Sequence, residues 1–302
     1  MGSPMKRMMV IFAALLAVTG SQTAADVPHY PFHHAREREA WIRSGDERDE
    51  SWVNIAHRGA SGYAPENTMA SFVKAFDMGA DMLELDVQLS KDGEVVVIHD
   101  STVERTTDGQ GEVGGLTLEE LRRLDAGSWY DSSFKGEVIP TLAEVLEHFG
   151  GRIGLLIELK SPSRYPGIEQ KVAGDLRRYA AQTDGLRYKD LIIVQSADTD
   201  SLVRFRQLMP DIPLGVVITS AGDLSKQRLD NMKAYADYVS ISMRLVSKGL
   251  VQKIHQSGMK TMVWTIRDML QIPYVLQINV DGIITDYPDR VPITISNRNM
   301  TR

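Results

Sequence analysis

The chain has 302 residues, of which 43% are hydrophobic and 25% charged, a composition typical of a soluble globular protein. This length is enough for one large α/β barrel or two small domains. The formal net charge of −6 argues against a nucleic-acid-binding protein, which would carry a basic stripe. The absence of cysteine excludes disulfides, thiolate zinc sites and a lipid-modified N-terminal cysteine.

The N-terminal segment has the pattern of a secretory signal peptide. Lys6 and Arg7 precede the uncharged apolar run Met8–Val18, and small residues follow it. We therefore expect residues 1–25 to be cleaved and the protein to be exported, to the periplasm or the medium. The apolar run is shorter than the roughly 20 residues of a transmembrane helix, and an uncleaved anchor is the alternative. The polar residues 26–51 are interpreted as an N-terminal arm.

From Trp52 onward, short apolar runs alternate with helical patterns, which predicts right-handed β–α–β units and a parallel sheet. Eight such strands favour a (β/α)8 TIM barrel over residues 52–302, with a doubly wound open sheet as the alternative. The predicted strands are Trp52–Ala56, Met82–Gln88, Ile153–Leu159, Leu191–Gln195, Leu214–Ile218, Tyr238–Ile241, Thr261–Trp264 and Gly282–Thr285. The predicted helices are Thr68–Met78, Ile168–Ala181, Thr199–Leu208, Leu224–Ala236, Lys248–Gln256 and Asp268–Leu276.

Two segments interrupt this alternation after the second barrel strand. Leu89–Ile98 is predicted to form a hairpin that turns at Lys91-Asp92-Gly93. The following residues, 101–140, are too long for a simple connection and contain a short helical pattern at Leu116–Leu124, so we interpret them as a small inserted cap. Three aromatic residues of this insertion either line the site or pack in the insertion's own core, and packing is favoured for two of them: Trp129, Tyr130 and Phe134.

Glu84 and Asp86 lie inside Met82–Leu89, which otherwise has the composition of a buried strand. Residues i and i+2 of a strand point to the same face, so the two carboxylates stand side by side. Burying both costs several kcal/mol unless a cation joins them. A divalent metal with oxygen ligands is the natural compensation, and an edge strand with a solvated acidic face is the alternative.

Other polar residues fall at the carboxyl ends of the predicted strands, where the active site of a parallel barrel lies. Glu158 and Lys160 end the third strand and again share a face by their i, i+2 spacing. Convergence from several strands argues against a separate structural explanation for each residue. The remaining strand-end residues are His57 and Arg58 on the first strand, Gln195 on the fourth and Trp264 on the seventh.

Six short motifs stand in order along the chain: His57-Arg58-Gly59, Pro65-Glu66-Asn67-Thr68, Glu84-Leu85-Asp86, Lys91-Asp92-Gly93, His99-Asp100 and Glu158-Leu159-Lys160. In this order they resemble the glycerophosphodiester phosphodiesterase family, of the bacterial, exported type, over residues 52–288. The resemblance implies a (β/α)8 barrel with an insertion in the same place. One departure is Gln195-Ser196-Ala197, where family members often have an aromatic third residue, and this puts the local pocket shape in question.

The resemblance implies metal-dependent hydrolysis of glycerophosphodiesters to sn-glycerol 3-phosphate and an alcohol. We predict that one divalent cation, Ca²⁺ or Mg²⁺, is bound by three oxygen ligands, Glu84, Asp86 and Glu158. Asp286 is a weaker candidate ligand, with helix capping or the orientation of Arg58 as its alternative roles.

His57 and His99 have side chains suited to general acid and base catalysis near neutral pH. We assign His57 as the acid and His99 as the base, although the sequence does not distinguish them, and His99 has a capping or metal-orienting role as its alternative. Arg58 and Lys160 are predicted to bind the substrate phosphate. Gln195 and Trp264 are predicted to line the substrate pocket. Asn67 or Thr68 is predicted to cap the helix that follows. Glu66 is predicted to hold His57 or a neighbouring loop.

Two further functions stay open at this stage. The first is a phospholipase D-like hydrolase of lysolipids on the same barrel, and the second is a non-catalytic binding protein. The favoured partner is a water-soluble glycerophosphodiester. We expect neither nucleic-acid binding nor stable membrane insertion after signal cleavage.

Overall fold

The computed structural model describes residues 52–182 and 191–292, all of which fall within one compact unit of the chain. The predicted signal peptide and N-terminal arm lie outside the described residues. Within the part that is described, no helix combines the length and apolar character needed to cross a bilayer.

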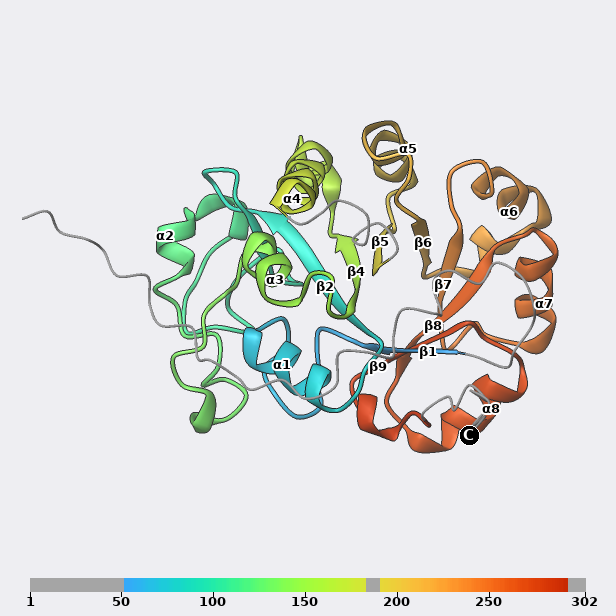
Figure 1. The fold of residues 1–302 in the computed structure, drawn as a ribbon, viewed down its shortest axis with the longest axis horizontal. Helices are drawn as coiled ribbons and strands as arrows, with labels where there is room; N and C mark the ends of the chain where they lie inside the picture. Colours follow the sequence, from blue (N-terminus) through green and yellow to red (C-terminus); the bar gives the residue numbers. More distant parts are fainter. Residues whose placement is uncertain (1–51, 183–190, 293–302) are drawn as a thin grey trace, which may run out of the picture. The chain divides into compact units, whose positions relative to one another are not determined.

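Eight parallel strands close into a barrel, because the last strand, β9, pairs with the first, β1, and β1 also pairs with β2. The fold is therefore the predicted (β/α)8 TIM barrel, and the open doubly wound sheet is excluded. Helices surround the strands, and the blue β1 lies beside the red β9 (Figure 1). The barrel strands are β1 Val53–Ala56, β2 Met82–Leu89, β4 Gly154–Leu159, β5 Ile192–Ser196, β6 Leu214–Ile218, β7 Tyr238–Ser242, β8 Lys260–Ile266 and β9 Gly282–Thr285.

Amphipathic helices cover the outside of the barrel, and their apolar residues share one large core with the outward-facing strand residues. The α-helices are α1 Met69–Asp77, α2 Leu118–Leu121, α3 Leu142–Phe149, α4 Ile168–Gln182, α5 Thr199–Leu208, α6 Lys226–Met232, α7 Lys248–Gln256 and α8 Ile272–Gln277. The 3-10 helices are η1 Val113–Gly115, η2 Ser132–Phe134, η3 Pro162–Arg164, η5 Ala221–Leu224, η6 Met269–Gln271 and η7 Pro288–Arg290.

The predicted hairpin is confirmed, since β3 (Val95–Val97) pairs antiparallel with the end of β2. Residues 101–140 follow it and carry η1, α2 and η2. This insertion lies to the left of the barrel strands in Figure 1. Together with β3 it has a small apolar core separate from that of the barrel, made of Val96, Ile98, Val103, Val113, Leu121, Ala126 and Ile139.

Strand alternation places the polar residues of interest inside the barrel. A second apolar cluster fills the barrel interior and includes Ile55, Met82 and Leu156. Residues two and four positions beyond these on the same strands have the same orientation and come closer to the carboxyl ends. The same face of each strand therefore carries apolar residues deep inside the barrel and the predicted site residues above them, near the carboxyl end.

Two helices differ from the sequence predictions. α3 was not predicted, although Thr141 and Glu144 form a capping box at its start, a signal that the sequence contains. The predicted helix over 268–276 is split into η6 and α8. Pro273 lies in the first turn of α8, where its missing N–H does no harm, but it cannot continue a helix from the preceding turn.

Candidate active site

Three carboxylates converge inside the barrel at the carboxyl ends of β2 and β4. Asp86 and Glu158 are paired in the strand register, and Glu84 precedes Asp86 by two residues on the same face. One oxygen from each lies within 4.8 Å of the other two, and all three residues are buried. The structure thus brings together the three residues predicted as metal ligands, called the carboxylate cluster below.

The protonation of this cluster reflects its crowding. The pKa of Glu84 is raised well above its usual value, first by burial and then by the charges of Asp86 and Glu158. Burial also raises the pKa of Asp86, but Arg58 and Lys160 outweigh it and hold that pKa below its usual value. A divalent cation would remove the repulsion and favour ionised Glu84. Three hard oxygen donors without sulfur or nitrogen fit Ca²⁺ or Mg²⁺ better than zinc.

The backbone at Arg58 is left-handed, with φ of 54°, which costs about 1–3 kcal/mol for a residue other than glycine. This bend lets the Arg58 backbone N–H donate to Glu84 Oε2 at 2.8 Å. Gly59 follows with φ of 79°, and a Cβ there would lie 2.4 Å from Ser71 Oγ. The turn after β1 therefore requires glycine, which explains the His-Arg-Gly order.

Two cationic side chains flank the carboxylate cluster. Arg58 donates from a terminal nitrogen to Glu66 Oε1 at 2.7 Å, and its Nε lies 3.2 Å from Asp86 Oδ2 without forming a hydrogen bond. Lys160 Nζ donates to Glu158 Oε1 at 2.7 Å and lies 3.8 Å from Asp86 Oδ1. Burial lowers the pKa of Lys160, but Glu158 and Asp86 raise it above its usual value, so the ammonium stays charged.

His57 follows β1 and lies beside the end of β9. Its Nδ1 is 2.6 Å from Asp286 Oδ1, and Arg267 Nε donates to Asp286 Oδ2 at 2.5 Å. Burial raises the pKa of Asp286, but His57 and Arg267 together lower it to about 2, so it is a carboxylate at neutral pH. The carboxylate accepts the proton of Nδ1 and leaves Nε2 for other partners. Burial lowers the pKa of His57, although the Asp286 bond opposes this.

The structure corrects the alternative roles predicted for Asp286. Both of its carboxylate oxygens bind other groups, so it does not orient Arg58. The next helix, η7, begins at Pro288 without a side-chain cap. Among the described residues, Asp286 is not part of the carboxylate cluster. The register pairs Ala56 with Thr285, so a closed barrel places the two following residues, His57 and Asp286, next to each other.

His99 follows β3 and is held by its sequence neighbour. Its Nδ1 lies 2.6 Å from Asp100 Oδ1, and Arg105 donates to both oxygens of that carboxylate. These contacts with Arg105 and His99 hold the pKa of Asp100 well below its usual range. The carboxylate therefore accepts from Nδ1 of His99, as Asp286 does from His57.

The strand end that carries His99 is fixed by a buried glutamine. Gln88 Nε2 donates to the carbonyls of Ile98, His99 and Asp100 at 2.7–2.9 Å, and Tyr165 donates its hydroxyl to Gln88 Oε1. We did not predict this role. The sequence did contain a signal for it: Gln88 follows Glu84 and Asp86 at the same spacing of two residues in one buried strand.

Glu66 does not contact His57 but binds two arginines, Arg58 and Arg105, and so holds the neighbouring insertion. Burial raises its pKa, but the arginines lower it below the usual value. Thr68 caps α1, as predicted for one of two residues. Asn67, the other, donates to Asp86 Oδ2 at 2.9 Å, so it supports the carboxylate cluster.

Gln195 lies on β5 and Trp264 on β8, and each contacts Ser240 of β7. Gln195 is buried, donates from Nε2 to Glu158 Oε2 and accepts from Ser240 Oγ. The Trp264 indole packs on the interior apolar cluster and donates to the Ser240 carbonyl. Gln195 thus supports a candidate metal ligand, and the prediction that both residues line a substrate pocket stands as a prediction.

The three aromatic residues of the insertion form an edge-to-face chain of their own. Tyr130 contacts Trp129 and Phe134 with centroid distances of 5.8 and 5.7 Å. None of them belongs to the insertion's apolar core, which corrects the packing favoured from the sequence. Burial raises the pKa of Tyr130, and so do Tyr287, which follows β9, and Tyr63, which lies between β1 and α1.

The fold and this arrangement define an α/β-barrel protein with a candidate oxygen-donor metal site and two aspartate-bound histidines at its mouth. Residues 57–290 match the model of the glycerophosphoryl diester phosphodiesterase family. The chain belongs to that family, as its motifs predicted.

The relatives cover most of the chain. The Bacillus subtilis protein YhdW is 46% identical over 236 residues, which cover 78% of this chain and 94% of that one. A glycerophosphodiester phosphodiesterase of Caldanaerobacter subterraneus is 39% identical over 237 residues, with 78% and 94% covered. The solved structure of an Oleispira antarctica phosphodiesterase, in complex with the product sn-glycerol-3-phosphate, is 33% identical with a TM-score of 0.69 and covers 78% of this chain and 94% of that one.

Proposed function

We propose that this chain is a metal-dependent glycerophosphodiester phosphodiesterase, which releases sn-glycerol 3-phosphate and an alcohol. The observation that carries the proposal is the convergence of the carboxylate cluster, two cations and two aspartate-bound histidines inside one barrel mouth. The names of its relatives, and the product bound to the Oleispira antarctica enzyme, support the same substrate class.

Glu84, Asp86 and Glu158 would hold the divalent cation, Ca²⁺ or Mg²⁺. When bound, such a cation supplies positive charge to the phosphate oxygens and polarises the phosphorus centre. Arg58 and Lys160 stand beside these ligands and add two further positive charges. The planar guanidinium grips two phosphate oxygens in a forked geometry, whereas the ammonium acts as a point charge.

The two histidines carry the proton transfers. Hydrolysis needs one group that takes a proton from the attacking water and one that protonates the leaving oxygen. In both histidines Nδ1 faces an aspartate, so Nε2 is the nitrogen that exchanges protons with substrate or water. We assign His57 as the acid and His99 as the base. Burial favours neutral His57 in the free protein, whereas a bound phosphodiester anion favours its protonated form.

A chelation experiment tests this proposal. EDTA should reduce hydrolysis of glycerophosphocholine to background, and added Ca²⁺ or Mg²⁺ should restore it. Glu84→Gln and Asp86→Asn should raise the metal concentration needed for half-maximal activity. Glu112→Gln removes an exposed carboxylate of the insertion and is the matched control, expected to behave as wild type. Full activity in a demonstrably metal-free preparation would overturn the metal requirement.

The phospholipase D-like alternative has one specific observation in its favour. The edge-to-face chain of Trp129, Tyr130 and Phe134 lies near Tyr63 and Tyr287, and Trp129 is 38% exposed. Such a surface can bind an acyl chain. We favour water-soluble diesters, because the rest of the insertion's exposed surface is largely polar. The test is a competition between glycerophosphocholine and lysophosphatidylcholine at equal concentration. A higher kcat/KM on the lysolipid would reverse the assignment.

We also propose that the protein is exported and that its leader is cleaved near Ala25. The basic, apolar and small-residue order of residues 1–25 supports this. Mass spectrometry of the natively expressed protein should give a mature start close to Asp26. An intact leader on a protein recovered from the cytosol would contradict it.

A further inference from the structure

Arg105 lies in the insertion and contacts two carboxylates at once. It donates to both oxygens of Glu66 at 2.8 Å, from its two terminal nitrogens. It also donates to both oxygens of Asp100, from Nε at 2.6 Å and from a terminal nitrogen at 3.1 Å. One guanidinium therefore makes four hydrogen bonds to two residues that are 34 positions apart in the sequence.

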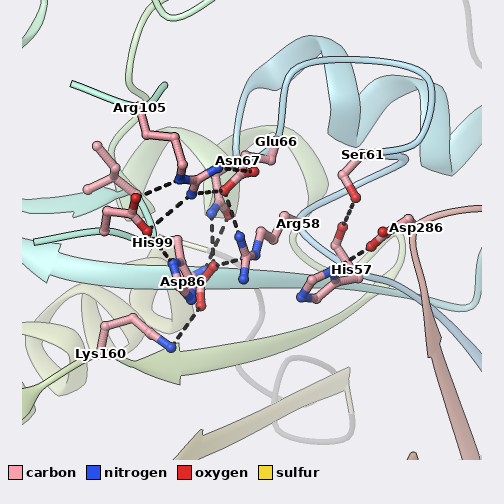
Figure 2. Close-up of polar contacts among 12 residues, drawn as sticks. His57, Arg58, Ser61, Glu66, Asn67, Asp86, His99, Arg105, Lys160 and Asp286 are labelled. Atoms are coloured by element: carbon pink, nitrogen blue, oxygen red, sulfur yellow. Dashed lines mark hydrogen bonds and ion pairs between the residues drawn. The ribbon is translucent and has the colours of Figure 1, made fainter. Parts of the chain in front are cut away.

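Each of these carboxylates has a second partner in the site. Asp100 binds Nδ1 of His99, and Glu66 Oε1 also accepts from Arg58 at 2.7 Å. A continuous chain of contacts thus runs from His99 through Asp100, Arg105 and Glu66 to Arg58 (Figure 2). Its two ends are the histidine and the guanidinium proposed to act on the substrate, whereas Arg105 contacts neither of them.

The geometry requires arginine and not merely a positive charge. A guanidinium presents five donors in a rigid plane and can bind two carboxylates side-on, whereas an ammonium is a compact charge that lacks this fork. The backbone on both sides of Arg105 is anchored, since Val103, Thr106 and Thr107 are buried in the insertion. The side chain is 44% exposed, so its position depends on the four bonds more than on surrounding packing.

We propose that Arg105 is a positioning residue that fixes the His99 imidazole and the Arg58 guanidinium relative to each other. This inference rests on the proposed phosphodiesterase function. Without Arg105, Asp100 keeps His99 and Glu66 keeps Arg58 as partners among the described contacts, but nothing joins the two carboxylates. His99 then loses its fixed orientation, and Glu66 draws Arg58 away from the phosphate. The insertion is thereby a part of the site and not only a cover.

The kinetic test compares Arg105→Ala and Arg105→Lys with wild type on glycerophosphocholine. We expect Arg105→Ala to lower kcat by about tenfold or more, the usual loss when a group that orients a site residue is removed. Arg105→Lys should not restore kcat, because a point charge cannot bridge both carboxylates. Arg122→Ala is the matched control, since it removes another insertion arginine that pairs with Glu144. A kcat within twofold of this control would overturn the proposal.

Double variants separate positioning from a general loss of stability. Asp100→Asn combined with Arg105→Ala should lower kcat no further than the worse single variant, because both changes break the same chain. Adding Glu66→Gln to Arg105→Ala removes the charge that draws Arg58 away from the phosphate and should bring KM back toward the wild-type value. Effects on kcat that multiply, together with a KM that does not recover, would show that Arg105 acts only on the fold.

A measurement without turnover keeps this proposal separate from the phosphodiesterase assignment. In protein with ¹⁵N-labelled histidine, Arg105→Ala should shift the His99 ring-nitrogen resonances, while Arg122→Ala leaves them unchanged. If wild type hydrolyses no glycerophosphodiester, the proposed function fails, and this readout still decides whether Arg105 positions His99. Unchanged His99 resonances would overturn the positioning role.

Discussion

His57 and His99 are held by the same kind of contact in two different parts of the molecule. Each has Nδ1 at 2.6 Å from an aspartate oxygen, and an arginine binds the same aspartate. The first set, His57–Asp286–Arg267, stands on the barrel ends of β1, β8 and β9. The second set, His99–Asp100–Arg105, stands on the end of β3 and the insertion. In Figure 2, His57 and Asp286 lie to the right of Arg58, whereas His99 and Arg105 lie to its left.

The two sets differ in burial and in how they are anchored. The side chains of His57 and Asp286 are 11% and 14% exposed, against 29% and 31% for His99 and Asp100. The barrel itself fixes the buried set through strand pairing. The exposed set follows β3, whose end is held by Gln88, and its arginine also binds a second carboxylate, Glu66. The same chemistry is therefore stabilised by the main fold in one place and by a dedicated side-chain clamp in the other.

Of all the changes considered, removing either histidine should lower activity the most. We expect His57→Ala and His99→Ala each to lower kcat by about 100-fold or more while the circular dichroism spectrum stays native. The pH–rate profile then separates their roles. Loss of the acid should remove the alkaline limb, and loss of the base should remove the acidic limb. If His57→Ala removes the acidic limb, the assignment of the two histidines is reversed.

An intermediate effect concerns stability at low pH. The folded-state pKa of Asp286 is about 2 against an ordinary value of 3.8, which corresponds to about 2 kcal/mol of stability at neutral pH. Because this pKa is depressed on folding, the contribution is present above about pH 4 and is lost as the pH falls toward 2. Asp286→Asn should therefore destabilise the protein at pH 7 but not near pH 2.

Urea unfolding of wild type and Asp286→Asn at several pH values checks this expectation. Asp100→Asn is the counterpart in the exposed set, and its effect on stability should be smaller because solvent screens that pair. If wild type and Asp286→Asn differ in free energy of unfolding by the same amount at every pH, the link between the Asp286 pKa and stability is contradicted.

The smallest loss of activity is expected when Arg267 is replaced by alanine. Its side chain is 65% exposed and, among the described contacts, it binds one carboxylate, whereas Arg105 binds two. Exposed pairs typically contribute 1 kcal/mol or less, so Arg267→Ala should change kcat/KM by less than about fivefold. Raising the salt concentration should shrink that difference further. A loss as large as that of Arg105→Ala would remove the distinction between the two sets.

Much of the fold and of the cluster could be predicted because it depends on local pattern. Strand alternation alone places Glu84 and Asp86 on one face, and the βα order predicts the barrel. Glu158 and Lys160 follow from the same period on the next parallel strand. The shared faces need only neighbours within a few residues, and the barrel needs only the repeated order of strands and helices.

The unpredicted residues depend on contacts between distant segments. Arg105 reaches Glu66 across 39 positions from an insertion without a regular period, so no spacing indicates the pair. Arg267 meets Asp286 only because two loops emerge beside each other from β8 and β9. Packing in the insertion's core was favoured for two of its three aromatic residues, whereas the actual core is aliphatic.

The separate apolar core of the insertion has a consequence for how the protein responds to heat. A small, independently packed cluster can open while the larger barrel remains folded, because local stability follows the size of each cooperative unit. Opening would carry away Arg105 and leave His57, the carboxylate cluster and the Gln88-bound strand end with His99 in place. Activity should then fall several degrees below the midpoint at which barrel helicity is lost, and it should return on cooling without global refolding.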